Sequence, residues 1–122
     1  MIVSSLLFAV IALTVYGQLI IKARALVHAA EYAESGSKLP YLFAMFSDFR
    51  VISGLVAALI AGACWILTIE RLDVGYAYPF MAVSFVAVPI GSNLFLGEPL
   101  PAAQLIGLFL IIAGVSVSAL SR

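Results

Sequence analysis

Four stretches without a charged residue constrain this chain more than any other feature of its sequence. They cover residues 1–21, 51–69, 74–97 and 100–121. Each approaches or exceeds the roughly 18 to 20 apolar residues that a helix needs to cross about 30 Å of hydrocarbon. The chain is 65% hydrophobic and only 10% charged, whereas roughly a quarter of the residues in soluble domains are charged. These features predict a polytopic membrane protein.

The predicted fold is all-α, a single domain built as a bundle of four transmembrane helices. The expected spans are residues 2–21, 51–69, 75–96 and 102–120. The first has no Lys or Arg before it and a long apolar run, so we interpret it as an uncleaved helix. The long connection of residues 22–50 holds a short helix at 39–49, which suits the membrane interface because Leu42, Met45, Phe46 and Phe49 share one face. The alternative is that this segment lengthens the second span.

The residues needed for most enzymatic chemistry are absent. Cys64 is the single cysteine and His28 the single histidine, so the chain offers no internal disulfide and no zinc site. We expect His28 on the surface. The sequence contains no nucleophile–base pair, metal cluster or phosphate-binding loop, and no polybasic tail for nucleic acid. We therefore expect no metal, no cofactor and no enzymatic activity.

The end of the first span carries a polar stripe. Thr14, Gln18 and Lys22 follow one another at steps of four residues, so they lie on one face of the helix. Under one interpretation, Lys22 extends its amine to the interface and Gln18 bonds to a neighbouring helix. Under the other, they bind an anionic head group, since an ionisable residue near a span is a functional hypothesis by default.

The third span contains residues that an inert anchor helix does not need. Pro89 lacks the N–H that a helix interior requires, and with Gly91 it predicts a kink or hinge. Ser92 and Asn93 are suited to hydrogen bonds across helices or to a water-filled cavity. Two tyrosines near the start, Tyr76 and Tyr78, either settle at the interface or contact a ligand.

The fourth span carries the surface that we expect to pair with another subunit. Gly107 and Gly114 are seven residues apart, and Ser118 follows four residues later, so these small residues share a face that permits close helix pairing. In the second span, Gly54, Ala58 and Gly62 at steps of four also indicate helix packing. Between the third and fourth spans, Glu98 lies where a carboxylate gains from the dipole of the following helix.

One motif resembles that of a known superfamily. Residues 72–79 read LDVGYAYP and residues 97–100 read GEPL, followed by Gln104, Gly107 and Gly114. This pattern resembles the drug/metabolite transporter superfamily with EamA-type repeats. Its small four-span members include the small multidrug resistance exporters and the paired subunits of the flippase for undecaprenyl-phosphate-linked aminoarabinose. Gly17 and Gln18 followed by Lys22 are also similar to those flippase subunits.

The sign of one charge distinguishes these two groups. The multidrug exporters use a membrane-embedded glutamate in their first span, whereas here the ionisable residue is Lys22. A lysine repels a lipophilic cation and attracts a phosphate. The resemblance therefore implies a flippase, or a flippase subunit, for a polyprenyl-phosphate-linked sugar such as undecaprenyl-phosphate aminoarabinose, in the bacterial inner membrane.

This resemblance also implies roles for particular residues. Lys22 binds the phosphate with Gln18 as its hydrogen-bond partner, and Pro89 and Gly91 allow the third span to switch. Glu98 either caps the fourth span, the role we expect, or binds an amino sugar. The remaining residues of the head-group route are Thr14, Tyr76, Tyr78, Ser92 and Asn93. The expected partners are the lipid-linked anionic substrate, membrane lipids, and a second copy or a homologous subunit of opposite orientation.

Two alternatives remain open. One is a proton-coupled exporter of small cations or metabolites, of the small multidrug resistance type, that uses Glu70, Asp73 or Glu98. The other is a non-transporting subunit that scaffolds a glycosyltransferase. For orientation, four basic residues (Lys22, Arg24, Lys38 and Arg50) precede the second span, whereas Arg71 and Arg122 lie on the other side, which modestly favours both termini outside.

Overall fold

The computed structural model of the protein describes residues 2–34 and 36–121, and Arg122 of the charge count lies outside them. Five helices are present: α1 (Ile2–Glu31), α2 (Leu39–Ser47), α3 (Phe49–Arg71), α4 (Val74–Leu96) and α5 (Ala102–Leu120). All except α2 are long and apolar enough to cross a membrane. No strand occurs within the described ranges, so the predicted all-α class with four spans is confirmed.

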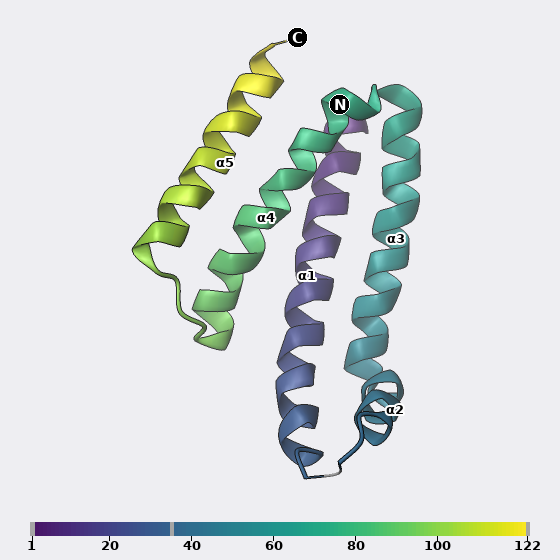
Figure 1. Cartoon of the computed structure of the whole chain (residues 1–122). Coiled ribbons are helices and arrows are strands. Elements are labelled where there is room, and N and C mark those ends of the chain that lie inside the picture. Colours follow the sequence, from purple (N-terminus) through teal and green to yellow (C-terminus); the bar gives the residue numbers. More distant parts are fainter. Residues whose placement is uncertain (1, 35, 122) are drawn as a thin grey trace.

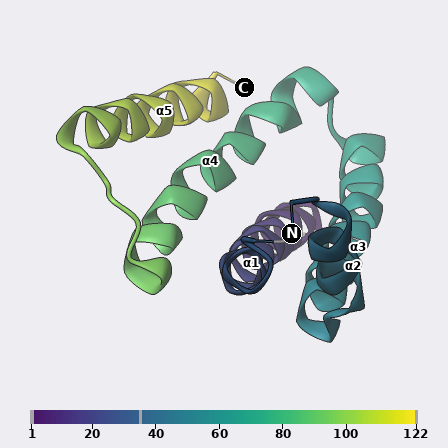
Figure 2. The same ribbon diagram turned by 60° about the horizontal axis from the view of Figure 1, so that its bottom comes forward.

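The long helices stand in the spatial order α3, α1, α4, α5 (Figures 1 and 2). α1 and α3 run antiparallel over most of their length, and α4 packs on another side of α1. Among the described helices, α5 packs on α4 alone, so the row does not close into a ring. α1 therefore lies between α3, which it contacts over most of its length, and α4, which it contacts less extensively.

The contact between α1 and α3 is close enough to bring their backbones together. A Cβ atom added to Gly17 would lie 3.0 Å from the carbonyl oxygen of Gly54. Beside them, the hydroxyl oxygens of Tyr16 and Ser53 are 2.8 Å apart. Small residues permit such approach in a membrane, where packing drives helix association. Gly54 therefore lies in a close helix contact, as its spacing predicted. Gly62 does not, because a Cβ added there would meet no atom within 4 Å.

The junction between α1, α2 and α3 is held by Asp48. This residue is the N-cap of α3, and its side chain accepts a hydrogen bond from the Arg50 backbone N–H. Its Oδ2 lies 2.6 Å from Arg24 Nε and 2.8 Å from His28 Nε2. These hydrogen bonds, the one from His28 first and that from Arg24 next, hold the pKa of the Asp48 carboxyl well below its usual range. The expectation that His28 lies on the surface is wrong, because Asp48 draws it into a buried position.

α1 continues to Glu31, and α2 packs against the ends of α1 and α3. α2 occupies most of the segment predicted as an interfacial helix, and Pro40 stands in its first turn, where a missing N–H costs nothing. Its apolar side chains differ in burial: Met45 is buried, whereas Phe43 and Phe46 are exposed. An exposed aromatic face suits a helix at the membrane surface, and that placement stays a prediction.

Candidate functional site: the cleft between α1 and α4

Two rows of side chains face each other between α1 and α4. Thr14, Gln18 and Lys22 are on α1; Ser84, Val88 and Ser92 are on α4 and share the same spacing of four residues. They line two adjoining pockets, of about 330 Å³ and 210 Å³, which have Gln18 and Val88 in common. We call the whole the α1–α4 cleft. The larger part is the inner pocket, and the smaller part, which contains Lys22, is the lysine pocket.

The lysine pocket brings together two opposite charges. Lys22 Nζ lies 3.6 Å from Glu98 Oε1, and the two side chains are 50% and 38% exposed. An ion pair between side chains this exposed contributes about 1 kcal/mol or less to stability, although the paired oxygen, Glu98 Oε1, is itself shielded from water. The distance is also too long for a hydrogen bond. The contact is therefore an ion pair that a ligand can displace at little cost.

Two polar atoms of the lysine pocket lack hydrogen-bond partners among the described residues. They are Ser92 Oγ, in a residue only 7% exposed, and Glu98 Oε1, which is itself buried. More than nine in ten buried polar groups in proteins are hydrogen-bonded, and each exception requires an explanation. The described residues have three such atoms, and two of them, all except His28 Nδ1, line this one pocket beside a lysine. That combination favours a ligand with polar groups of its own.

The connection between α4 and α5 places Glu98 in this pocket. Gly97 ends α4 with a left-handed φ of 70°, a conformation that glycine adopts without strain. The Glu98 N–H then donates to the Ser92 carbonyl, and Asn93 Nδ2 donates to the Glu98 carbonyl over 2.8 Å. Asn93 thus holds the connection in shape. The expected capping role of Glu98 is wrong, because the N-cap residue of α5 is Pro101, no side chain caps this helix, and Glu98 lies beside Lys22.

The inner pocket is mostly apolar, with a few polar groups. Thr14 and Gln18 contribute from α1, and Ser84, Phe85 and Pro89 from α4. Because Pro89 has no N–H, the Phe85 carbonyl loses its usual helix donor. Ser84 is a site residue that was not predicted from the sequence; it is buried and donates to the Met81 carbonyl. Its signal was available, since Ser84 and Ser92 repeat on α4 the four-residue step that revealed the stripe on α1.

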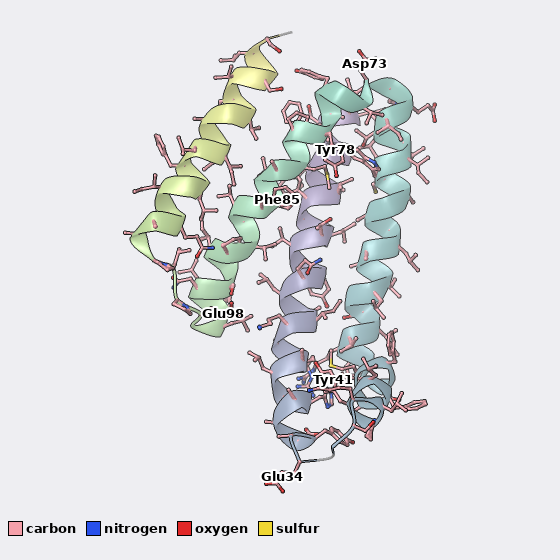
Figure 3. All side chains as sticks on the ribbon, viewed as in Figure 1. Glu34, Tyr41, Asp73, Tyr78, Phe85 and Glu98 are labelled. Atoms are coloured by element: carbon pink, nitrogen blue, oxygen red, sulfur yellow. The ribbon has the colours of Figure 1, made fainter. Side chains whose placement is uncertain are left out.

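The predicted tyrosines lie at the other end of α4, far from the lysine pocket. Figure 3 shows Tyr78 near the start of α4 and Glu98 beyond its end. The Tyr76 hydroxyl donates to the Ala119 carbonyl of α5 over 3.3 Å. Tyr78 places its ring edge-on to Trp65 of α3, with the centroids 6.0 Å apart. Tyr76 thus forms a hydrogen bond to α5 and Tyr78 a ring contact with α3, and neither lies with Lys22.

α4 runs unbroken through Pro89 and Gly91. Gly91 packs against α1, where an added Cβ would lie 2.8 Å from a Leu19 methyl group. Hinge motion at these two residues stays a prediction. Two carboxylates invoked for a proton-coupled exporter, Glu70 and Asp73, flank the turn between α3 and α4, at the opposite end from Lys22.

The predicted pairing surface lies on α5, the least buried of the four spans. Leu108 is the single buried residue of this helix. A Cβ added at Gly107 or Gly114 would meet no atom within 4 Å, and Ser118 is half-buried. Pairing through these residues stays a prediction.

Known proteins similar to this chain are flippase subunits. It is 44% identical over 55 residues to a probable 4-amino-4-deoxy-L-arabinose-phosphoundecaprenol flippase subunit ArnE of Pseudomonas paraeruginosa, a match that covers 45% of this chain and 48% of that protein. Over 72 residues it is 35% identical to the ArnE subunit of Pseudomonas syringae, covering 58% of this chain and 67% of that protein. The chain belongs to this family of flippase subunits.

The resemblance extends to the second subunit type of this family. The chain is 35% identical over 65 residues to a probable ArnF subunit of Shewanella sediminis, covering 52% of this chain and 45% of that protein. The chain spans about half the length of the first curated relatives it matches. No family model matches the chain, and no solved structure matches it.

Membership of the flippase-subunit family agrees with the four apolar helices. Together they make the chain a multi-pass protein of a bacterial inner membrane. The relatives are subunits of a transporter and not enzymes, as the sequence predicted for this chain. Each relative is named as a flippase subunit, and two subunit types, ArnE and ArnF, occur among them, which is consistent with a working unit larger than one chain.

Proposed function

We propose that this chain is one subunit of a flippase for a polyprenyl-phosphate-linked amino sugar, the lipid class in the names of its relatives. The observation that carries the proposal is the lysine pocket. A cation stands there at the end of a span, beside buried polar atoms without partners. Such a pocket suits a phosphate at the membrane surface. Four thin helices in an open row also allow the prenyl chain to remain in lipid while the head group occupies the α1–α4 cleft.

In this proposal each part of the cleft has a role. Lys22 binds the phosphate, Gln18 donates from one turn deeper, and Ser92 supplies a hydroxyl from the opposite helix. The inner pocket, with Thr14 and Ser84, continues the path toward the middle of the membrane. Pro89 and Gly91 lie where a change in the course of α4 would widen or narrow the cleft.

We further propose that the chain works as a dimer through α5. Gly107, Gly114 and Ser118 would meet a second copy or a homologous subunit, which would rebuild the inverted repeat found in many transporters. The chain would then be a small four-helix member of the drug/metabolite transporter superfamily. The excess of basic residues around Lys22 would place the lysine pocket on the cytoplasmic side.

Native mass spectrometry of the protein, released from mild detergent with its co-purified lipids, tests this function. We expect a dimer that retains a polyprenyl-phosphate species. In Lys22→Ala, retention should fall about tenfold to a hundredfold, the usual cost of losing a charge-assisted hydrogen bond. The matched control is Lys38→Ala, because Lys38 lies outside the cleft and over the Tyr41 ring.

The assay separates the possible errors. Equal retention by the unaltered protein and Lys22→Ala would contradict the phosphate role of Lys22. A dimer that holds only bulk phospholipid would favour the small-solute exporter. A lone monomer would show that the working partner is a different chain.

A further inference from the structure

The ion pair in the lysine pocket presents a problem for a purely anionic ligand. Lys22 and Glu98 neutralise each other in the described structure, with 3.6 Å between Nζ and Oε1. A phosphate that binds Lys22 would displace Glu98 and then lie beside its carboxylate. Like charges at such distances repel, most strongly where the pocket excludes water. Binding phosphate alone would therefore leave Glu98 both unpaired and opposed by the ligand.

A ligand with both charges removes this problem. Its phosphate replaces Glu98 as the partner of Lys22, and its ammonium group replaces Lys22 as the partner of Glu98. Lys22 and Glu98 each keep a partner of opposite charge when the ligand binds, so neither charge is left unpaired. The same exchange excludes ligands that lack the ammonium group, which is how unpaired charge produces specificity.

We propose that Glu98 is the specificity-determining residue for the ammonium group of a zwitterionic head group, with the Lys22–Glu98 ion pair opening as that head group binds. The inference rests on the proposed function and deepens it. It assigns the two charges of an amino sugar phosphate to two residues on different elements of the chain.

The placement of the two residues permits such an exchange. Lys22 is on α1, whereas Glu98 is on the connection that follows α4. Both side chains are substantially exposed, so they are free to separate without disturbing a packed core. Glu98 Oε1 has no hydrogen-bond donor among the described residues, and an ammonium group carries three. The Ser92 hydroxyl also has no hydrogen-bond partner among the residues that the structure describes, so it is available to donate to the phosphate.

The backbone around Glu98 is held by two hydrogen bonds that do not involve its side chain. The Glu98 carbonyl accepts from Asn93, and its N–H donates to the Ser92 carbonyl. These bonds hold the Glu98 Cα beside the lysine pocket, which the residue lines. Replacement of the carboxylate by an amide therefore changes the charge and leaves the connection in place.

Lipid binding to the protein in nanodiscs tests the inference. One ligand is a polyprenyl phosphate amino sugar with a free amine, and the other is the same lipid with its amine acetylated. We expect the unaltered protein to bind the free amine about tenfold more tightly, the effect of one charge-assisted hydrogen bond. Glu98→Gln should lose this preference by weakening only the free-amine lipid. Glu70→Gln, at the opposite end of the protein, controls for the lost charge.

Each outcome has a separate meaning. If the unaltered protein binds both lipids equally and Lys22→Ala weakens both, the inference is overturned and the proposed function stands. If Glu98→Gln keeps the preference, the amine is recognised elsewhere and the inference is again overturned. If the unaltered protein binds neither lipid, the proposed function fails as well. The comparison of lipids on the unaltered protein gives a result even if Glu98→Gln does not fold.

Discussion

The two faces of α1 show how one helix serves two purposes. Toward α3, Gly17 brings the backbones into contact, and Tyr16 bonds to Ser53 beside it. Toward α4, Gln18 and Lys22 line pockets, and the opposing Ser92 hydroxyl has no partner among the described residues. Gly17 and Gln18 are neighbours in sequence, yet Gly17 lies where the α1 and α3 backbones approach each other closely, whereas Gln18 lines both pockets of the α1–α4 cleft.

This difference indicates where stability and function reside. Lipid tails are as apolar as leucine, so helices in a membrane associate through close packing and hydrogen bonds instead of through the exclusion of water. The α1–α3 contact has both. The α1–α4 cleft leaves polar groups unmatched, which lowers stability unless a ligand supplies the missing partners. Substitutions on the two faces should therefore have opposite consequences for folding and for lipid binding.

The largest effect should come from closing the space between the backbones. In Gly17→Val the added side chain meets the Gly54 carbonyl and forces α1 away from α3, which we expect to cost about 1–3 kcal/mol of unfolding free energy and to reduce the yield of folded protein. The measurement is thermal unfolding in detergent. Gly62→Val is the control: its Cβ meets open space, so its effect should stay within about 0.5 kcal/mol. Equal losses in the two variants would contradict a special role for the Gly17 contact.

The next largest effect on stability should come from Asp48, which bonds to Arg24 and His28 of α1, and this effect depends on pH. Its pKa is lower in the folded protein than in the unfolded chain. Its contribution to stability is therefore fully present above the unfolded-state pKa of about 3.9 and is lost as the pH falls through the folded-state pKa. Asp48→Asn should lower the melting temperature at pH 7, because an amide caps α3 but does not neutralise Arg24.

The difference between the melting temperatures of the two proteins should stay constant from pH 7 to about pH 4 and should narrow only below that, as the pH falls toward the folded-state pKa of Asp48. Lipid binding at pH 7 should remain, since Asp48 lies outside the α1–α4 cleft. A difference in melting temperature that persists unchanged at pH 3 would show that charge pairing is not the cause.

The smallest effects should come from two serines and should differ in kind. The Ser53 hydroxyl donates a hydrogen bond to the Arg50 carbonyl and accepts one from the Tyr16 hydroxyl. Ser53→Ala should therefore cost about 1 kcal/mol in stability and leave lipid binding unchanged. Ser92→Ala should leave stability unchanged or slightly raised, because the lost hydroxyl has no partner. It should weaken binding of the polyprenyl phosphate roughly twofold to tenfold. The same response from both variants would remove the distinction between the two faces.

Sequence patterns were sufficient for the helices and for one half of the site. Uncharged runs of membrane length predicted four spans, since charge is costly in hydrocarbon wherever the fold places it. The four-residue step predicted the row from Thr14 to Lys22, because it depends only on helix geometry. Local rules of this kind require no knowledge of neighbours.

The other half of the site depends on contacts between distant segments. Nothing local predicts that Glu98 turns to Lys22 instead of to the start of α5, or that Asp48 buries His28. Tyr76 and Tyr78 share the superfamily-like motif with Glu98, yet a helix the length of the membrane separates them from it. Proximity in a motif does not give proximity in space when a whole span lies between its parts.

The loose attachment of α5 has a consequence for how the chain tolerates mutation. Within the chain, Leu108 alone is buried on this helix, so most α5 positions should accept any apolar residue that preserves membrane insertion. Any α5 position at which a systematic substitution series nevertheless shows strict size requirements must meet a surface outside the chain. Such a tolerance map of residues 102–120 would outline the footprint of whatever molecule covers α5.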